Sequence, residues 1–238
     1  LFVRLLKPSS FTPVLALMGV IFYMTSKNSK RKDTGTILLG FATLMFGMET
    51  MSGAVAGLKN VPAFANILVM FRHPVLGVAA GALLTAITQS SSASVGILQA
   101  LSSTGQVTVG VAIPIIMGQN IGTCITAIIS SVGANKNAKR AAMVHLIFNI
   151  IGTVFCLSIF SLVRAIFAPM ILDDSASLLG IAITHSAFNV ICTVVMLPLS
   201  QMLEKLSIRL VPDAKTAEVT PKLDDRLLTT PPLALGQA

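Results

Sequence analysis

The stretch PVLGVAAGALLTAITQSSSASVGILQALSS at residues 74–103 decides how the chain folds. Its two ends are apolar and rich in small residues, whereas its centre carries the polar run from Gln89 to Ser92. A helix needs about 20 residues to cross the roughly 30 Å hydrocarbon layer of a bilayer, and neither apolar end is that long. The stretch therefore predicts two short helical arms around a polar break.

The surrounding composition places this stretch in a membrane. Between His73 and Lys136 there is no Asp, Glu, Lys, Arg or His, and of all 238 residues 54% are hydrophobic and 11% charged. Soluble domains carry about 25% charged residues. The net charge of +8 could suggest a nucleic-acid partner, but no aromatic platform accompanies the basic residues, so we expect none. The composition predicts an all-α polytopic membrane protein.

Counting membrane crossings gives the central stretch its topology. The expected spans are 34–57, 107–131, 141–165 and 176–202, with 11–25 as a shorter fifth candidate. Basic clusters at Lys27–Lys32, Lys136–Arg140 and Lys205–Lys215 predict cytoplasmic loops. The first two clusters share a side only if an even number of crossings separates them, and 34–57 and 107–131 supply two. Residues 74–103 must then enter and leave on the outer side as a re-entrant hairpin.

The polar centre of this hairpin is the first candidate site, with Thr88 beside Gln89, Ser90, Ser91 and Ser92. A broken helix leaves N–H groups free at the start of one arm, where they favour an anion. It leaves carbonyls free at the end of the other arm, where they can ligate a cation. The alternative is that small polar residues only allow close helix packing, as Gly77 and Gly81 are expected to do.

A second cluster runs from Gly118 to Thr123 in the middle of the expected helix 107–131. The glycines at 118 and 122 are expected to unwind the helix around Gln119 and Asn120 and to expose backbone carbonyls. Oxygens of Asn120 and Thr123 suit a hard cation such as Na⁺. The alternative is a tolerated kink in an otherwise regular helix.

These motifs resemble a known family. GALLTAITQSSSASVGILQALSSTG at 81–105 and GQNIGTCITAIISSVGANKNAKRAAMVHLIFNIIGTV at 118–154 closely resemble bacterial sodium/phosphate cotransporters related to the animal type II renal transporters. Members carry a QSSS motif in each of two inverted repeats, followed by a G-x-N-I-G-T signature. The resemblance implies substrate and ion binding by Thr88, Gln89, Ser90, Ser91, Ser92, Gln119, Asn120 and Thr123, with Na⁺ at Gln89, Ser91, Asn120 and Thr123. Two positions depart from the pattern, since Gln119 stands where the family usually has Ala and Cys124 where it often has Thr.

The resemblance also sets the expected organisation, because only one QSSS occurs. Residues 1–25 are expected to be the tail of a missing first repeat, and 26–203 a transport repeat that pairs with that missing repeat. Residues 204–238 are expected to be a cytoplasmic linker toward a PhoU-like domain. The chain would then be about half of an inverted-repeat transporter in the cell membrane. It would symport inorganic phosphate with Na⁺ as the coupling ion, use no other cofactor, and not be an enzyme.

Several residues are left with open interpretations. Glu49 is the sole ionisable residue between Asp33 and Lys59, which makes it either a functional acid or a carboxyl reaching the outer interface. His145 and His185 recur in an H-x-x-F-N echo at 142–154 and 182–194 and are expected to be packing residues. The three cysteines lie in apolar runs, where we expect free thiols.

Two other functions compete with transport. An intramembrane serine hydrolase could use Ser90–Ser92 with His145, but no G-x-S-x-G context surrounds the serines and no acid is placed to orient the histidine. A membrane subunit that transports nothing is the other alternative.

Overall fold

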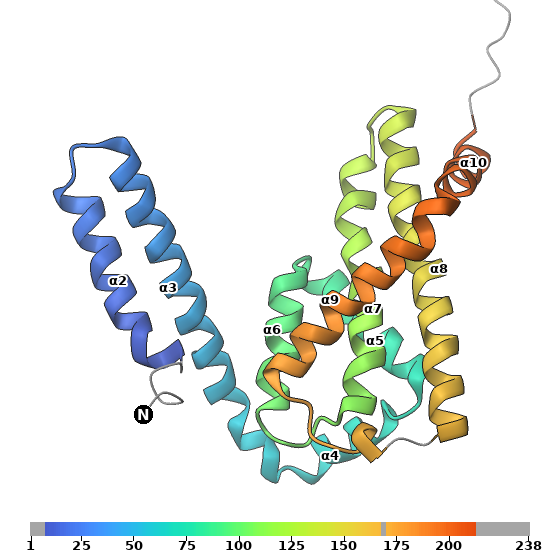
Figure 1. Cartoon of the computed structure of the whole chain (residues 1–238), viewed down its shortest axis with the longest axis horizontal. Helices are drawn as coiled ribbons and strands as arrows, with labels where there is room; N and C mark the ends of the chain where they lie inside the picture. The colour runs from blue at the N-terminus through green and yellow to red at the C-terminus, as the bar shows by residue number, and fades with distance from the viewer. Residues whose placement is uncertain (1–7, 168–169, 213–238) are drawn as a thin grey trace, which may run out of the picture.

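The computed structural model describes residues 8–167 and 170–212, which are almost entirely helical (Figure 1). The α-helices are α2 (Pro8–Thr25), α3 (Ser29–Val55), α4 (Pro62–Met70), α5 (Pro74–Thr88), α6 (Ser91–Ser102), α7 (Val109–Ser131), α8 (Lys136–Phe167), α9 (Leu178–Met196) and α10 (Ser200–Leu210). Short 3₁₀ turns follow α3, α8 and α9, at Ala56–Asn60, Met170–Leu172 and Leu197–Leu199.

Four helical segments are long and apolar enough to cross a membrane: Ser29–Leu58, Val109–Ser131, Lys136–Phe167 and Leu178–Leu210. They coincide with the four predicted spans, and the shorter apolar helix Phe11–Thr25 coincides with the fifth candidate. The chain is a multi-pass membrane protein. Large apolar side chains on the outward faces of these helices, such as Ile37 at 70% exposure, suit contact with lipid.

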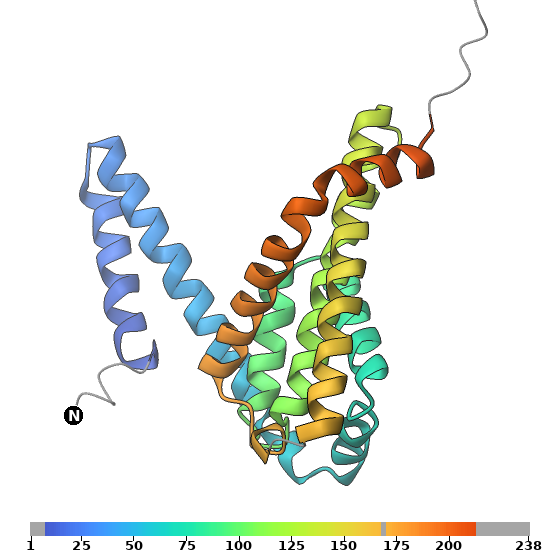
Figure 2. The same cartoon turned by 45° about the vertical axis from the view of Figure 1, so that its right-hand side comes forward.

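The structure confirms two short arms at 74–103, since α5 has 15 residues and α6 has 12. The arms fold back on one another, and the Thr85 hydroxyl donates to the Ser94 hydroxyl at 2.7 Å between them. Figures 1 and 2 show this hairpin rising from the end of the molecule where α4 lies and stopping part-way along α7 and α8. Neither arm reaches the opposite end.

A bend that the sequence pattern did not predict leads into the hairpin. Helices α4 and α5 meet at 110°. Each helix begins with a proline, and the residues before them, Val61 and His73, have extended backbones with ψ of 110° and 115°. Proline disfavours helical geometry in the residue before it, so Pro62 and Pro74 each restart the helix in a new direction.

The predicted unwinding at Gly118–Thr123 is wrong, because α7 is one continuous helix from Val109 to Ser131. Its glycines serve close packing instead. A Cβ on Gly118 would strike the carbonyl oxygen of Val78 in α5, and one on Gly122 would strike that of Ala82. The fit is reciprocal, since a Cβ on Gly81 of α5 would strike the carbonyl of Ile115. Small residues four apart thus let two backbones touch, as expected for Gly77 and Gly81.

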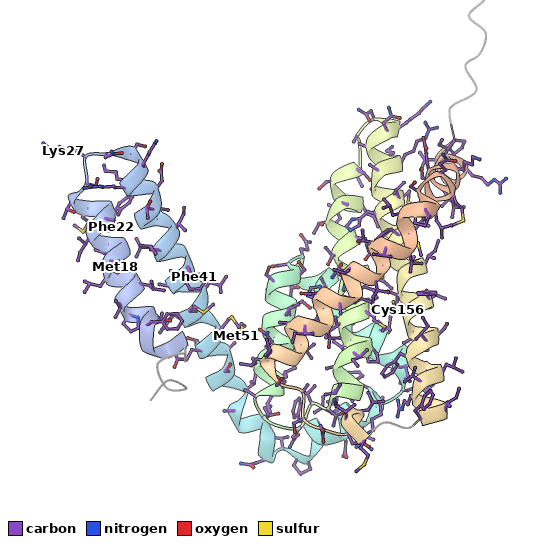
Figure 3. The ribbon with its side chains drawn as sticks, in the orientation of Figure 1. Met18, Phe22, Lys27, Phe41, Met51 and Cys156 are labelled. Atoms are coloured by element: carbon purple, nitrogen blue, oxygen red, sulfur yellow. The ribbon has the colours of Figure 1, made fainter. Side chains whose placement is uncertain are left out.

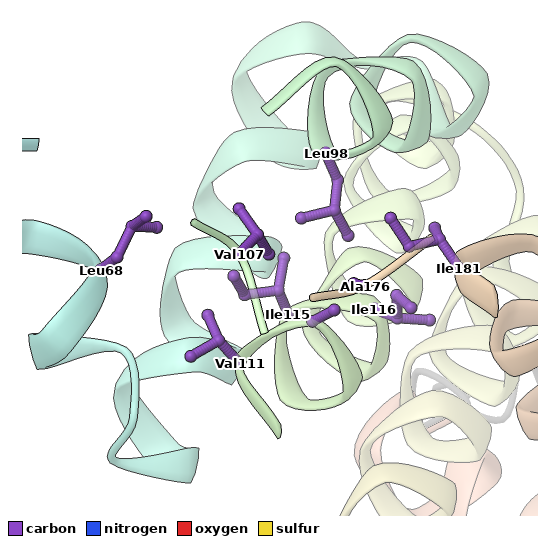
Figure 4. Packing of buried hydrophobic residues seen from close by; sticks show 9 residues of the cluster. Leu68, Leu98, Val107, Val111, Ile115, Ile116, Ala176 and Ile181 are labelled. Atoms are coloured by element: carbon purple, nitrogen blue, oxygen red, sulfur yellow. The ribbon is translucent and has the colours of Figure 1, made fainter. Parts of the chain in front are cut away.

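Helix α7 is the centre of the fold. In the most apolar 18-residue stretch of α7, 56% of the helix is buried inside the protein. The corresponding share is 6% for the span that contains α3. Figure 4 shows Ile115 and Ile116 of α7 packed with Leu98 of α6 and Ile181 of α9. The hairpin and α9 are therefore held against a fixed central helix.

The basic loops lie at the same end of the molecule, away from α4, although the α2–α3 turn is well separated from the other two. Figure 1 shows the α2–α3 turn, the α7–α8 turn and α10 at this end, and Figure 3 labels Lys27 in the first of them. Helix α10 continues beyond the predicted end of the last span at 202. Its Leu203 packs with Ile147 of α8 and Met196 of α9. The rest of the predicted linker, from 213 onward, lies outside the described residues.

The H-x-x-F-N pattern shared by α8 and α9 produces the same local hydrogen bond in both helices. Asn149 Nδ2 donates to the His145 carbonyl at 3.0 Å, and Asn189 Nδ2 donates to the His185 carbonyl at 2.9 Å. The two helices pack where a Cβ on Gly152 would lie 2.7 Å from Cys192 Sγ. Cys156 and Cys192 Sγ are 3.9 Å apart there, as two buried free thiols.

Candidate functional site

The break between the two arms falls at Gln89, which ends α5 in a left-handed conformation with φ 52° and ψ 21°. Within the described residues it is the one non-glycine with positive φ. Residues other than glycine pay about 1–2 kcal/mol for this conformation. Glycine or asparagine is the usual residue at such a helix end. A glutamine held there at a cost is the kind of strain that accumulates at functional sites.

The backbone at the break uses two of the polar side chains. Ser90 is the N-cap of α6, and its hydroxyl accepts from the Ala93 N–H at 3.2 Å. The Thr88 hydroxyl donates to the Leu84 carbonyl at 2.9 Å, one turn back in α5. Ser91 and Ser92 are the first residues of α6, where N–H groups have no acceptor within the helix. The hairpin thus presents a helix start that carries two serines.

These serines face an open cavity of about 790 Å³ between α3, α6 and α9. Figure 1 shows α3 on one side of it and α6 and α9 on the other. Its lining takes one stripe of α3, the start of α6 and one residue of α9: Gly40, Thr43, Leu44, Gly47, Met48, Met51, Ser90, Ser91, Ser92, Ala93, Val95, Gly96, Gln99 and His185. This lining contains no Lys, Arg, Asp or Glu. An anion bound there needs a cation beside it.

A buried polar group connects the hairpin to α7. Gln119 is 1% exposed, and its Nε2 donates to the Ser94 carbonyl of α6 at 3.0 Å. Its Oε1 is buried and has no hydrogen-bond partner within the described part of the chain. A buried acceptor without a donor costs about 1–3 kcal/mol. Gln119 therefore holds the second arm against α7 and leaves one buried oxygen without a donor among the described residues.

The Thr85–Ser94 hydrogen bond should be measurable as a coupling between the two arms. Both residues are 0% exposed. We expect the Thr85→Val and Ser94→Ala substitutions to be non-additive in thermal stability, with a coupling near the 0.6–1.7 kcal/mol typical of such bonds in membranes. The measurement is a double-mutant cycle on the intact protein in detergent. Pairing Thr85→Val with Ser102→Ala is the control, because Ser102 bonds within α6; equal coupling in both cycles would contradict the expectation.

Asn120 and Thr123 are held by their own helix. Asn120 Nδ2 donates to the Ile116 carbonyl at 2.9 Å, and the Thr123 hydroxyl donates to the Gln119 carbonyl at 2.9 Å. Both bonds use the donor and leave the side-chain oxygen as an acceptor. Neither residue lines the cavity of Ser90–Ser92. The predicted Na⁺ set of Gln89, Ser91, Asn120 and Thr123 stays a prediction.

The cavity adds residues that sequence reasoning did not place in a site. His185, expected to be a packing residue, lines the cavity with Ser91 and Ser92. The α3 residues recur at spacings of three and four, which is the signal of one helix face. Glu49 is exposed on α3 and is not part of the lining, and Gln89 is exposed at the break.

The model of the family described as Na⁺/Pi-cotransporter matches residues 1–53 and 59–183, which is most of the chain. The chain belongs to the Na⁺/Pi-cotransporter family. This is a family of transporters and not of enzymes. No solved structure matches the chain.

Three curated relatives in this comparison show how the similarity is distributed. The Bacillus subtilis "Uncharacterized protein YqeW" is 30% identical over 84% of this chain and 64% of the relative. The Escherichia coli K12 "Putative inorganic phosphate export protein YjbB" is 27% identical over 97% of this chain and 42% of the relative. The human "Sodium-dependent phosphate transport protein 2B" is 40% identical over 48% of this chain and 18% of the relative. The chain therefore spans less than two thirds of the length of each of these three relatives.

Proposed function

We propose that this chain forms part of the translocation path of a sodium-coupled phosphate transporter, with phosphate bound at the start of α6. The observation that carries the proposal is the hairpin break itself. It aims a helix start with Ser91 and Ser92 at an open cavity of about 790 Å³. N–H groups and the dipole at a helix start favour an oxyanion, and broken helices of this kind build the binding sites of many carriers.

Sodium is the countercharge in this proposal. Phosphate carries between one and two negative charges near neutral pH, and the cavity lining offers no Lys or Arg. Placing an unpaired anion at membrane depth costs several kcal/mol. The buried Oε1 of Gln119 and the oxygens of Asn120 and Thr123 are neutral acceptors of the kind that Na⁺ prefers. Each ion then stabilises the site of the other.

The test is sodium-dependent uptake of labelled phosphate by proteoliposomes that hold the intact protein. An inward Na⁺ gradient should drive phosphate inward, and reversing the gradient should drive it outward. Phosphate movement that ignores Na⁺ would contradict the coupling. Absence of any phosphate movement by well-folded protein would favour a membrane subunit that transports nothing.

We further propose that residues 1–25 are the tail of a first repeat and that 26–203 form a transport repeat that pairs with it. The support is that a single QSSS motif occurs in the sequence, at Gln89–Ser92. Inverted-repeat carriers build one central site from both halves. Residues 1–238 alone should therefore show less than about a tenth of the uptake of the intact protein per folded molecule. Vigorous uptake by the fragment would mean that two copies complete the site.

The basic loops are proposed to be cytoplasmic, which makes the α4 end the outer end. Cysteines placed at Ser26 and Asn135 should react with a membrane-impermeant thiol reagent only from the inside, and one placed at His73 only from the outside. The native cysteines are buried and give a low background. Labelling of the 135 position from outside would overturn both the orientation and the re-entrant reading of 74–103.

A serine hydrolase is disfavoured by the arrangement. His145 lies on α8 and its carbonyl accepts from Cys124 and Asn149, whereas the serines lie in the cavity lined by α3 and α9. His185 does line this cavity, but no Asp or Glu of the lining is available to orient it.

A further inference from the structure

A second polar cavity lies at the α4 end of the molecule and belongs to none of the motifs discussed above. It measures about 160 Å³, and its polar lining comes from Arg72, Thr108, Arg164 and Asp173. One water needs only about 10–15 Å³ of such space, so the cavity has room for a small oxyanion with bridging waters. Figure 1 places this end, with α4 and the end of α8, opposite the basic loops.

Two arginines from distant parts of the chain meet here. Arg164, half-buried in the last turn of α8, donates from Nη1 to the carbonyl of Arg72 at 2.8 Å. That bond fixes the guanidinium on the turn between α4 and α5. A guanidinium has five N–H donors, of which this bond uses one. Arg72 itself is exposed and contributes a second guanidinium to the same lining.

The position of these arginines runs against the charge pattern of the chain. The basic clusters lie at the other end, and Lys and Arg are depleted on the outer side of membrane proteins. A pair of arginines that shares a cavity at the outer end therefore calls for a ligand. Guanidinium groups bind oxyanions through paired, parallel hydrogen bonds, which makes them suited to phosphate or sulfate.

The other polar groups favour a protonated oxyanion. Thr108 precedes α7 without a side-chain capping bond, so its hydroxyl is available to the cavity. Asp173 brings the formal charge of the lining to +1. An ionised carboxylate only accepts hydrogen bonds. Phosphate at neutral pH keeps a P–OH group that can donate to it, whereas sulfate and the phosphodiester of a lipid headgroup have no such proton.

We propose that Arg72, Thr108, Arg164 and Asp173 form an outer site that binds inorganic phosphate without Na⁺, next to the start of the hairpin. The two arginines hold the oxyanion and Asp173 recognises its proton. This inference rests on the proposed phosphate transport and on the proposed orientation. Arg72 is two residues from Pro74, which begins α5, so the site would hold phosphate at the outer foot of the arm that leads to Ser91.

The test is calorimetric titration of the intact protein in detergent, in choline buffer without Na⁺, with inorganic phosphate, sulfate and glycerophosphocholine as separate probes. The wild type should bind phosphate and show at least tenfold weaker binding of the other two. Arg72→Gln should weaken phosphate binding about tenfold or more, because it removes a charged hydrogen-bond donor. This variant keeps the Arg72 carbonyl that anchors Arg164. Arg164→Lys keeps the charge, loses the paired geometry and should also weaken binding.

Asp173→Asn tests most directly whether the carboxylate selects a protonated oxyanion. This variant should bring the sulfate affinity to within about threefold of the phosphate affinity. Arg209→Gln, in the last turn of α10 at the opposite end, is the control and should bind phosphate like the wild type. No sodium-free phosphate binding, or unchanged affinities in Arg72→Gln and Asp173→Asn, would overturn the proposal. Equal binding of glycerophosphocholine would assign the cavity to lipid headgroups and also overturn it. If the protein binds phosphate without Na⁺ through Arg72 but shows no phosphate uptake, only the transport proposal would be contradicted.

Discussion

Replacement of Gly118 by alanine is expected to leave little folded protein in the membrane. The added Cβ would clash with the Val78 carbonyl oxygen in α5. Overpacking typically costs 1–3 kcal/mol and more where the neighbour cannot move. A backbone carbonyl inside a helix cannot rotate away, and α5 cannot retreat without moving the hairpin. We expect at least a tenfold loss of monodisperse protein, measured by size-exclusion chromatography of a fluorescent fusion.

Gly53→Ala is the matched control, because a Cβ at Gly53 of α3 would meet nothing within 4 Å. Alanine also favours a helix over glycine by about 1 kcal/mol, so this variant should be at least as stable as the wild type. Gly81→Ala should behave like Gly118→Ala, since its Cβ would strike the Ile115 carbonyl. Equal yields of Gly118→Ala and Gly53→Ala would show that α5 and α7 are not packed this closely.

The same glycines show where sequence reasoning stopped. Gly118 and Gly122 are compatible with an unwound helix and with a close helix contact, and nothing local separates the two. Which of the two arrangements forms depends on the partner surface, here Val78 and Ala82 of α5, about forty residues earlier in the chain. Asn120 and Thr123 then bond to their own helix and help to keep it regular. Local polarity indicated a possible site, which stays a prediction, but it could not give the backbone conformation.

The hairpin was predictable because its signals are local. Pro74 starts an arm, Ser90 is a strong N-cap residue, and the polar run falls between two apolar arms that are each too short to span. The count of crossings then required both arms to start from one end. The position of Gln89–Ser92 near mid-membrane stays a prediction.

The lining of the cavity could not be predicted from the sequence, because it depends on tertiary contacts and not on local signals. The α3 stripe from Gly40 to Met51 has helical spacing, but spacing shows only that one face differs from the others. That this face meets Ser91 and His185 follows from the tertiary path through α4, with its 110° bend. The arginine pair at 72 and 164 depends in the same way on contacts between residues 92 apart.

Uptake should fall by about tenfold or more when Gln89 and Ser91 are both changed to alanine in the intact protein. Ser91 lines the cavity at the start of α6, and Gln89 supplies the amide at the break. Alanine at position 89 faces a similar left-handed cost, so the backbone break should persist. The effect should therefore come from lost ligand contacts. The measurement is phosphate uptake over a range of Na⁺ concentrations, corrected for membrane abundance.

The two ions should weaken together in this variant. If phosphate and Na⁺ neutralise one another, the coupling free energy between their binding steps is reciprocal. The half-saturating concentrations of both should rise, whereas Asn120→Ala and Thr123→Ala should first raise that of Na⁺. Ser103→Ala is the control, because that hydroxyl lies at the other end of α6 and donates to the Ala100 carbonyl at 2.6 Å. Normal uptake by the Gln89→Ala, Ser91→Ala protein at limiting phosphate would remove the hairpin break from the transport mechanism.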